Sequence, residues 1–307
     1  MSINEFMTTI AAPLILASVM FSLGLELKLA DFTRLLRQPK AVLVGLGNQM
    51  LLLPVVAFAL CYAFKLQPEL AVGLMIIALC PGGSTTNVLS KLAGGNVALS
   101  VSLTALASLL AFLTVSLLAS FSVVHFMGVD PGEIDTAKLT FSLFLMSFFP
   151  IVLGMGLTHF LPRAGTALAR FMMPVSLLLL LLLVVGILSR NTHLLVEWGG
   201  ILLAPICLMI AVMLALGLLS AKVTGLESRD ATTISIESGI QNGTMAIAVA
   251  VILNAQVLGT PQGAETAFMM PAAIYTFVMY GMSIPFVMWR RKYHAAQRPG
   301  GLESQSA

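Results

Sequence analysis

Charged residues are scarce in this sequence, and long polar stretches are missing. Only 9% of its 307 residues are Asp, Glu, Lys or Arg, whereas 58% are apolar. An ordinary soluble chain carries about 25% charged residues. The polar stretches between the apolar runs are too short to hold a soluble domain. The mean hydropathy of +0.99 instead indicates a membrane protein that crosses the bilayer several times.

Cysteine and histidine are also scarce, and they do not cluster. The three cysteines, Cys61, Cys80 and Cys207, all lie in apolar runs and have no metal-ligand spacing. The four histidines stand apart from them, which excludes a recognisable zinc site. We therefore expect buried thiols and no organic cofactor. The net charge of +3 comes from basic residues dispersed over short loops, so it does not indicate a nucleic-acid partner.

Apolar runs long enough to cross a bilayer recur along the whole chain. A spanning helix needs about 20 residues, and nine such segments can be drawn. They lie at approximately 8–27, 41–64, 71–92, 97–124, 139–161, 171–189, 199–221, 231–254 and 266–289. The first has no basic region ahead of it and no cleavage-site pattern after it, so we expect a membrane helix there and not a signal peptide.

Basic residues divide unequally between the two sides of these nine segments. Alternating loops place 13 of the 16 Lys and Arg residues on one side and 3 on the other. The positive-inside rule makes the side with 13 cytoplasmic. We expect the C-terminus inside and the N-terminus outside a bacterial inner membrane. Residues 295–307 would form a disordered cytoplasmic tail.

Two of the nine segments are interrupted by polar and helix-breaking residues. In the third, Cys80 to Asn87 (CPGGSTTN) places a proline and two glycines in an apolar run. In the eighth, Ser235 to Ala246 (SIESGIQNGTMA) holds a carboxylate, two amides and two glycines. Such residues also occur at simple kinks of membrane helices. Their matching positions, each second to last in its half of the chain, favour the broken helices of an inverted-repeat transporter.

Glu237 is the one acidic residue placed well inside a predicted span, since the other 12 fall in loops, tails or helix ends. An ionised carboxylate at membrane depth is costly unless its charge is compensated. Every Lys and Arg maps to a loop, the tail or a helix end. The compensating charge must therefore be a bound cation or a proton.

Oxygen-bearing side chains accompany this carboxylate. Gln241 lies one helical turn beyond Glu237 on the same face, and Ser100 and Thr104 repeat that spacing in the fourth segment. Further oxygens come from Gln49, Thr86 and Asn87. Each of these alone is more often a helix-packing residue. Together they suit a hard cation such as sodium.

The second half of each broken helix would begin near Ser84 and near Asn242. Free backbone amides and the positive end of the helix dipole favour an anion at such positions. The residues thus predict a cation site with an anion site beside it. This combination indicates a sodium-coupled transporter of an organic anion.

Four pieces of the sequence resemble a known family. They are Met20–Lys28 (MFSLGLELK), Cys80–Asn87 (CPGGSTTN), Gly95–Ser100 (GNVALS) and Glu237–Asn242 (ESGIQN). In this order they make nearly the whole chain resemble the bile acid:sodium symporter family. The resemblance implies an all-α membrane protein of inverted repeats with two discontinuous crossing helices. Bacterial members have ten helices, and this chain resembles that pattern without its first helix.

The resemblance also implies two domains in one transporter unit that works by alternating access. A core would comprise about 41–124 and 199–254, and a panel about 8–27, 139–189 and 266–289. The implied partners are two sodium ions, an organic anion and the lipid bilayer, with the chain acting as a monomer. The substrate stays open among bile acids and small carboxylates such as pantoate or pyruvate. In some relatives a His-Asn pair stands where this chain has Met279 and Tyr280.

Ligand residues follow from the same resemblance. One sodium site would comprise Thr86, Asn87, Ser100, Thr104 and Glu237. A second would use Gln49, Glu237 and Gln241 with the backbone carbonyls of Ser238 and Ile240. The substrate would lie near Gly83, Ser84, Asn242, Gly243 and Tyr280.

Two other functions are open at this point. A proton could replace sodium as the coupled ion if Glu237 carried it. An intramembrane hydrolase would use Ser84 or Ser238 as nucleophile and His159 as base, but no G-x-S-x-G motif is present. The oxygen-rich surroundings of Glu237 favour sodium over a proton. His159 is expected at the cytoplasmic end of its span, far in depth from either serine, which argues against the hydrolase.

Overall fold

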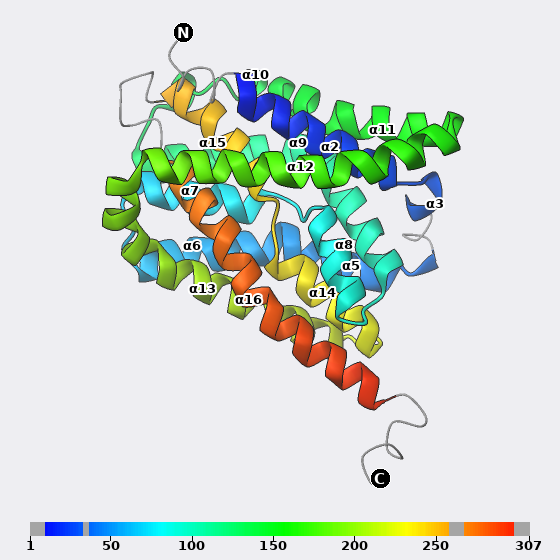
Figure 1. The fold of residues 1–307 in the computed structure, drawn as a ribbon. Helices are drawn as coiled ribbons and strands as arrows, with labels where there is room; N and C mark the ends of the chain where they lie inside the picture. The colour runs from blue at the N-terminus through cyan, green and yellow to red at the C-terminus, as the bar shows by residue number, and fades with distance from the viewer. Residues whose placement is uncertain (1–9, 33–36, 258–266, 298–307) are drawn as a thin grey trace.

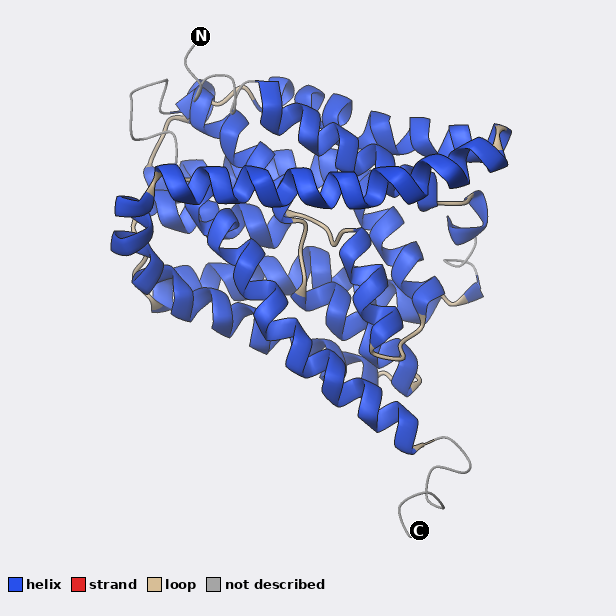
Figure 2. Ribbon diagram, viewed as in Figure 1, coloured by secondary structure: helices blue, strands red, loops and turns tan. Residues whose placement is uncertain are grey.

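A computed structural model describes residues 10–32, 37–257 and 267–297 of the chain (Figure 1). Every regular element in these residues is helical, and none is a strand (Figure 2). The α-helices are α2 (Ala12–Glu26), α3 (Leu29–Phe32), α5 (Pro39–Gly47), α6 (Leu53–Ala63), α7 (Pro68–Leu79), α8 (Ser84–Leu92), α9 (Val97–Met127), α10 (Thr136–Leu143), α11 (Phe149–Phe160), α12 (Pro162–Arg190), α13 (Thr192–Val223), α14 (Ser228–Gly239), α15 (Gly243–Val257) and α16 (Met269–Ala296). Two π-helical segments, Asn48–Leu52 and Phe144–Phe148, connect α5 to α6 and α10 to α11.

Seven spans of the described residues are long and apolar enough to cross a membrane, or eight if the bent pair α7 and α8 counts as one span. Three of the seven join consecutive elements: Pro39–Ala63 (α5 and α6), Thr136–Phe160 (α10 and α11) and Ser228–Val257 (α14 and α15). The first predicted span, 8–27, corresponds to a shorter apolar helix, Pro13–Glu26. Residues 8 and 9 of that span lie outside the described residues. The count of nine spans therefore stays a prediction.

Both interrupted segments are broken helices. Helix α7 ends at Leu79 and α8 begins at Ser84, with a bend of 65° between their axes. Helix α14 ends at Gly239 and α15 begins at Gly243. Figure 2 shows the two unwound stretches inside the helical body. Proline and glycine thus end these helices where the sequence predicted.

Helices α2, α10, α11 and α12 lie in the upper part of Figure 1, where α15 and α9 adjoin them. Helix α2 packs mainly on α11 and α12. A Cβ atom on Gly24 or on Gly154 would overlap the backbone of the facing helix, so α2 and α11 touch backbone to backbone. We call α2, α10, α11 and α12 the lateral layer.

Helix α16 packs chiefly on α13, α15 and α7, which fall in the ranges predicted for the core. The sequence had grouped 266–289 with the panel. Near its end, Arg290 donates from Nε to Thr232 Oγ1 (3.0 Å) and from Nη2 to Ser228 Oγ (2.8 Å), which fastens α16 to α14. Helix α16 continues through Ala296, two residues into the predicted tail, and residues 298–307 lie outside the described part of the chain.

Candidate functional site

The two helix breaks meet at the centre of the fold. The backbone amide of Asn242 donates to the carbonyl of Pro81 over 2.8 Å. The hydroxyl of Tyr275, on α16, donates to the Gly239 carbonyl and accepts from the Gln241 amide, both at 2.9 Å. These bonds satisfy backbone groups that helix breakage leaves without partners. The unwound backbone is therefore held in a defined shape.

Beside the crossing, the five residues predicted for the first ion site lie together. Ser100 Oγ is 2.5 Å from Glu237 Oε1 and 2.9 Å from Asn87 Oδ1. Thr104 Oγ1 lies 3.1 and 3.0 Å from the two carboxylate oxygens of Glu237, and 3.3 Å from Thr86 Oγ1. Four of the five side chains are fully buried, and Asn87 is 8% exposed. We call this group the carboxylate cluster.

The carboxylate cluster has more acceptor oxygens than hydroxyl protons. Ser100 and Thr104 each supply one proton, whereas Glu237 and Asn87 present three oxygens to them. The hydroxyl of Thr86 donates elsewhere, to the Gly83 carbonyl at 2.8 Å. Surplus lone pairs converging on one point suit a bound cation.

The backbone of the first break approaches this carboxylate closely. A Cβ atom on Gly82 would lie 2.8 Å from Glu237 Oε2 and 3.2 Å from Thr86 Oγ1. A side chain at this position would push into the carboxylate cluster. The first glycine of the CPGG motif is therefore required by the space around Glu237.

The residues predicted for the second ion site lie around the last turn of α14, with Gln49 contributed by the π-helical segment Asn48–Leu52. Gln49 Nε2 lies 3.3 Å from the Glu237 carbonyl and 3.2 Å from Gln241 Oε1. Gln241 Nε2 donates to the Ser238 carbonyl at 2.8 Å. Ile240 follows directly as the first unwound residue. Amide nitrogens thus face these carbonyls, while Gln49 Oε1 is buried without a hydrogen-bond partner.

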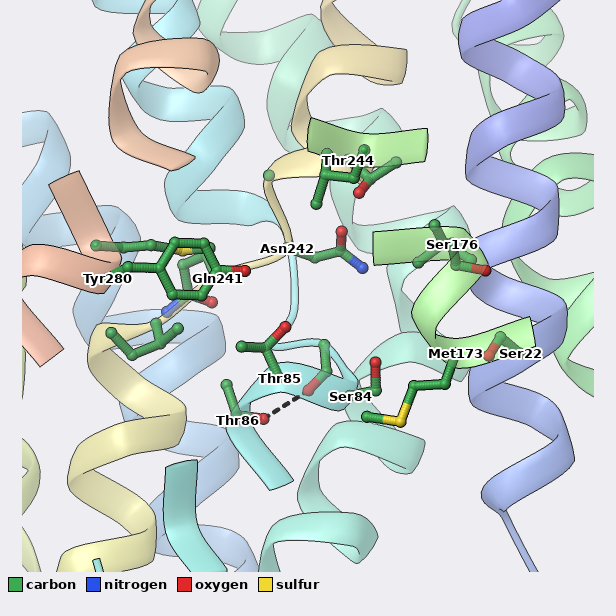
Figure 3. Close-up of a pocket in the computed structure, with 16 residues that line it drawn as sticks. Ser22, Ser84, Thr85, Thr86, Met173, Ser176, Gln241, Asn242, Thr244 and Tyr280 are labelled. Atoms are coloured by element: carbon green, nitrogen blue, oxygen red, sulfur yellow. Dashed lines mark hydrogen bonds between the residues drawn. The ribbon is translucent and has the colours of Figure 1, made fainter. Parts of the chain in front are cut away.

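A cavity of about 70 Å³ lies beside the crossing (Figure 3). All five residues predicted to contact substrate line it: Gly83, Ser84, Asn242, Gly243 and Tyr280. Thr85 and Thr244 stand beside them. The opposite wall comes from the lateral layer, with Val19 and Ser22 on α2 and Met173, Ser176 and Leu180 on α12. The cavity therefore lies between two groups of helices.

Three polar atoms around this cavity are buried without a hydrogen-bond partner: Asn242 Nδ2, Thr244 Oγ1 and Tyr280 Oη. The oxygen of the Asn242 amide is used, because it accepts from the Met245 amide at 3.1 Å at the start of α15. Figure 3 shows its nitrogen pointing toward the gap between the two walls. Buried polar groups normally have partners, so these three atoms are available to bind a polar ligand.

Sequence comparison places these features in a known context. The profile of the sodium bile acid symporter family matches residues 13–198. The chain belongs to this family. With seven or more apolar helices among its described residues, it is an integral membrane protein.

Several relatives of this symporter-family chain have names that state a role. It is 32% identical to the uncharacterized sodium-dependent transporter YocS of Bacillus subtilis over 76% of this chain and 72% of the relative. It is 27% identical to the human ileal sodium/bile acid cotransporter over 95% of this chain and 82% of the relative. A probable sodium/metabolite cotransporter of rice chloroplasts, BASS2, is 32% identical over 76% of this chain, but the match spans only 55% of that protein.

Several residues that line the cavity of this symporter-family chain were not predicted as site residues from the sequence. Ser22, Met173 and Ser176 enter the cavity from the lateral layer, whose sequence reads as plain apolar helix with isolated serines. Thr85 and Thr244 adjoin predicted residues, and that adjacency was an available signal. The bridging role of Tyr275 had no sequence signal, because it depends on α16 lying against the second break.

The hydrolase arrangement does not occur in this symporter-family fold. Ser84 lines the cavity at the crossing, whereas His159 lines a separate cavity of about 400 Å³ beside Lys28. The hydroxyl of Ser238 donates to the Ile234 carbonyl at 2.6 Å. Neither serine has the histidine as a neighbouring base.

Proposed function

We propose that this protein is a secondary transporter that couples sodium entry to the uptake of a small organic anion by alternating access. The observation that carries the proposal is the surplus of acceptor oxygens around Glu237. Its charge is met by hydroxyl groups, and no basic side chain hydrogen-bonds to it within the described residues. The names of the relatives, which state sodium-dependent transport, support the same ion.

The first sodium ion would bind within the carboxylate cluster, with Thr86, Asn87, Ser100, Thr104 and Glu237 as ligands. Sodium is a hard cation, and carboxylate, amide and hydroxyl oxygens are its usual protein ligands. When the ion binds, the hydroxyl protons would turn away from it and their oxygens would face it.

The second sodium ion would bind at the last turn of α14, between Gln49, Gln241, Glu237 and the carbonyls of Ser238 and Ile240. In the structure, the Gln49 amide nitrogen donates to the Glu237 carbonyl and the Gln241 amide nitrogen donates to the Ser238 carbonyl. Rotation of the Gln49 amide by half a turn would bring its unpartnered oxygen toward them. Free carbonyls at a half-helix end are suited to this purpose.

The substrate anion would bind in the cavity beside the crossing. The unpartnered Asn242 Nδ2 and the amides at the start of α8 and α15 would hold its charge. Pockets for drug-sized ligands have volumes of about 300–1,000 Å³, far above the 70 Å³ enclosed here. We therefore favour a small carboxylate over a bile acid.

Movement would occur between the lateral layer and the remaining helices. The cavity lies on that boundary, so relative motion would open it to either side of the membrane. Because α16 packs on α13, α15 and α7 and is bound to α14, we group it with the core. We orient the C-terminus to the cytoplasm on the basic-residue asymmetry of the sequence.

Uptake by proteoliposomes tests the proposal. Uptake of a mixture of small labelled carboxylates should require external sodium and should fail when choline or potassium replaces it. Glu237→Gln removes the charge at nearly constant shape and should abolish sodium dependence, whereas Glu197→Gln, at an exposed carboxylate, should leave uptake intact.

The membrane potential gives a further test. With two sodium ions and one monovalent anion, one net positive charge enters per cycle, and a potential of 100 mV contributes about 2.3 kcal/mol per cycle. An inside-negative potential should therefore accelerate uptake.

Proton coupling predicts a different result in the same assay. Uptake would follow the pH gradient and would be indifferent to the replacement of sodium by choline. That result would overturn sodium coupling while leaving the cavity assignment in place.

A further inference from the structure

Asp230 is a second buried carboxylate of α14, and the sites described above do not use it. Its side chain is 7% exposed, and its partner is neutral, because Asn96 Nδ2 donates to Asp230 Oδ1 over 2.8 Å. It lies seven residues before Glu237, two turns earlier on the same helix face. The helical rise puts the two residues about 10 Å apart along the axis.

Polar groups continue through the space between these two carboxylates. Thr233 lies on the same helix between them, is fully buried, and donates to the Asn96 carbonyl at 3.1 Å. Ser90, on α8, is also fully buried, and its hydroxyl has no hydrogen-bond partner. A Cβ atom on Gly95 would lie 2.7 Å from Thr233 Oγ1 and 3.2 Å from the Ser90 carbonyl. The Thr233 hydroxyl and the Ser90 backbone carbonyl therefore flank the same point.

Helices α8 and α9 extend this line to the carboxylate cluster. Asn96 is the N-cap of α9, and Ser100 follows one turn later with its hydroxyl against Glu237 and Asn87. Asn87 in turn lies three residues before Ser90 on α8. The resulting polar column is formed, in order from the end of the core where α14 begins, by Asp230, Asn96, Thr233, Ser90, Asn87 and Ser100.

We propose that this polar column is the route by which a sodium ion leaves the carboxylate cluster, with Asp230 as a transient ligand at its mouth. The inference rests on the proposed sodium coupling and adds a second cation-binding residue to it. A bare cation is strongly disfavoured in the protein interior. A line of hydroxyl, amide and carbonyl oxygens replaces part of its hydration shell and lowers the barrier to its passage.

The surroundings of the mouth explain why a carboxylate is needed there. Lys91 and Arg229 lie at this end of the core, and Arg290 reaches Ser228 and Thr232 on the first turn of α14. These basic side chains repel a departing cation. Asp230 is the buried acidic group among them, so its charge offsets the repulsion along the final step.

Two substitutions test the route in the purified full-length protein. Asp230→Asn removes the charge but keeps an oxygen for Asn96, and Ser90→Ala removes a buried hydroxyl that has no partner. Both should slow sodium exchange, measured by ²³Na NMR relaxation, by roughly tenfold, as a barrier higher by about 1.4 kcal/mol would do. The sodium concentration that gives half-maximal thermal stabilisation should stay unchanged, because the carboxylate cluster is intact.

The controls separate this role from a structural one. Glu227→Gln changes the exposed carboxylate three residues earlier and should exchange sodium at the wild-type rate, and Asp230→Glu should restore much of the rate. If Ser90→Ala and Asp230→Asn both exchange sodium as fast as wild type, or if Asp230→Asn only lowers thermal stability, the route is refuted. If wild-type protein shows no sodium-dependent relaxation beyond that of Glu237→Gln, the proposed sodium coupling itself fails.

Discussion

The backbone amide of Asn242 donates to the carbonyl of Pro81, so each broken helix supplies the partner that the other lacks. Breakage of a helix leaves amides and carbonyls without intrahelical partners, and inside a membrane each such group is costly. The bond links the two breaks directly. The carboxylate cluster and the ligand cavity both lie at this crossing, and Thr86 belongs to both. An ion in the carboxylate cluster and a ligand in the cavity would therefore both lie next to Thr86.

Gly82→Ala should weaken sodium binding. The new methyl group would lie 2.8 Å from Glu237 Oε2, so the carboxylate must shift. Overpacking of this kind costs about 1–3 kcal/mol, and each 1.4 kcal/mol weakens binding about tenfold. Gly83→Ala is the matched control, since its methyl group meets Asn242 Nδ2 at an ordinary 3.6 Å. Sodium-dependent thermal stabilisation measures both, and equal sodium affinity in the two variants would contradict the assignment.

Thr104→Val should abolish the sodium response, whereas Thr104→Ser should keep it. Valine has nearly the shape of threonine but lacks the hydroxyl that faces both oxygens of Glu237. Serine retains that oxygen and loses only a methyl group. The measurement is the sodium concentration needed for half-maximal uptake. A Val variant with wild-type sodium dependence would show that Thr104 is a packing residue only.

Asn242→Asp should separate anion binding from sodium binding. Aspartate keeps the oxygen that accepts from the Met245 amide and is a good N-cap, so α15 should form normally. The unpartnered nitrogen is replaced by a negative oxygen that repels an anionic substrate. Uptake should be lost while thermal stabilisation by sodium remains. Retention of uptake by this variant would remove Asn242 from the substrate site.

Tyr275→Phe should destabilise the protein more than Tyr280→Phe. The Tyr275 hydroxyl satisfies the Gly239 carbonyl and the Gln241 amide, and each buried group left without a partner costs about 1–3 kcal/mol. The hydroxyl of Tyr280 has no partner, so its removal should cost little stability and should affect substrate affinity instead. Thermal unfolding in detergent checks the difference, and equal melting temperatures for the two variants would argue against the bridge.

The sequence predicted the polar centre well because polarity in a membrane span is rare and costly. Glu237, Ser100 and Thr104 stood out for that reason, and the structure brings them together. The helix breaks were predictable from Pro81 and the glycines, whose effects on the backbone are local. Whether these side chains bind sodium stays a prediction.

What the sequence left open depends on contacts between distant helices. The cavity wall formed by Ser22 and Ser176 required knowledge of which faces of α2 and α12 point inward. The packing of α16 on α13, α15 and α7 is likewise set by neighbours, because its apolar residues are spread around the helix and mark no single face. Hydropathy measures whether a helix enters the membrane and says little about its partners there.

The small cavity between the lateral layer and the core has a pharmacological consequence. Its two walls belong to the two groups of helices that would approach each other in the proposed transport cycle. A carboxylate that carries a bulky tail could place its charge at Asn242 and still keep the walls apart. Such a compound would inhibit transport by preventing the two groups of helices from closing. The width of the tail, and not the chemistry of the head group, would then decide whether a carboxylate is transported or inhibits.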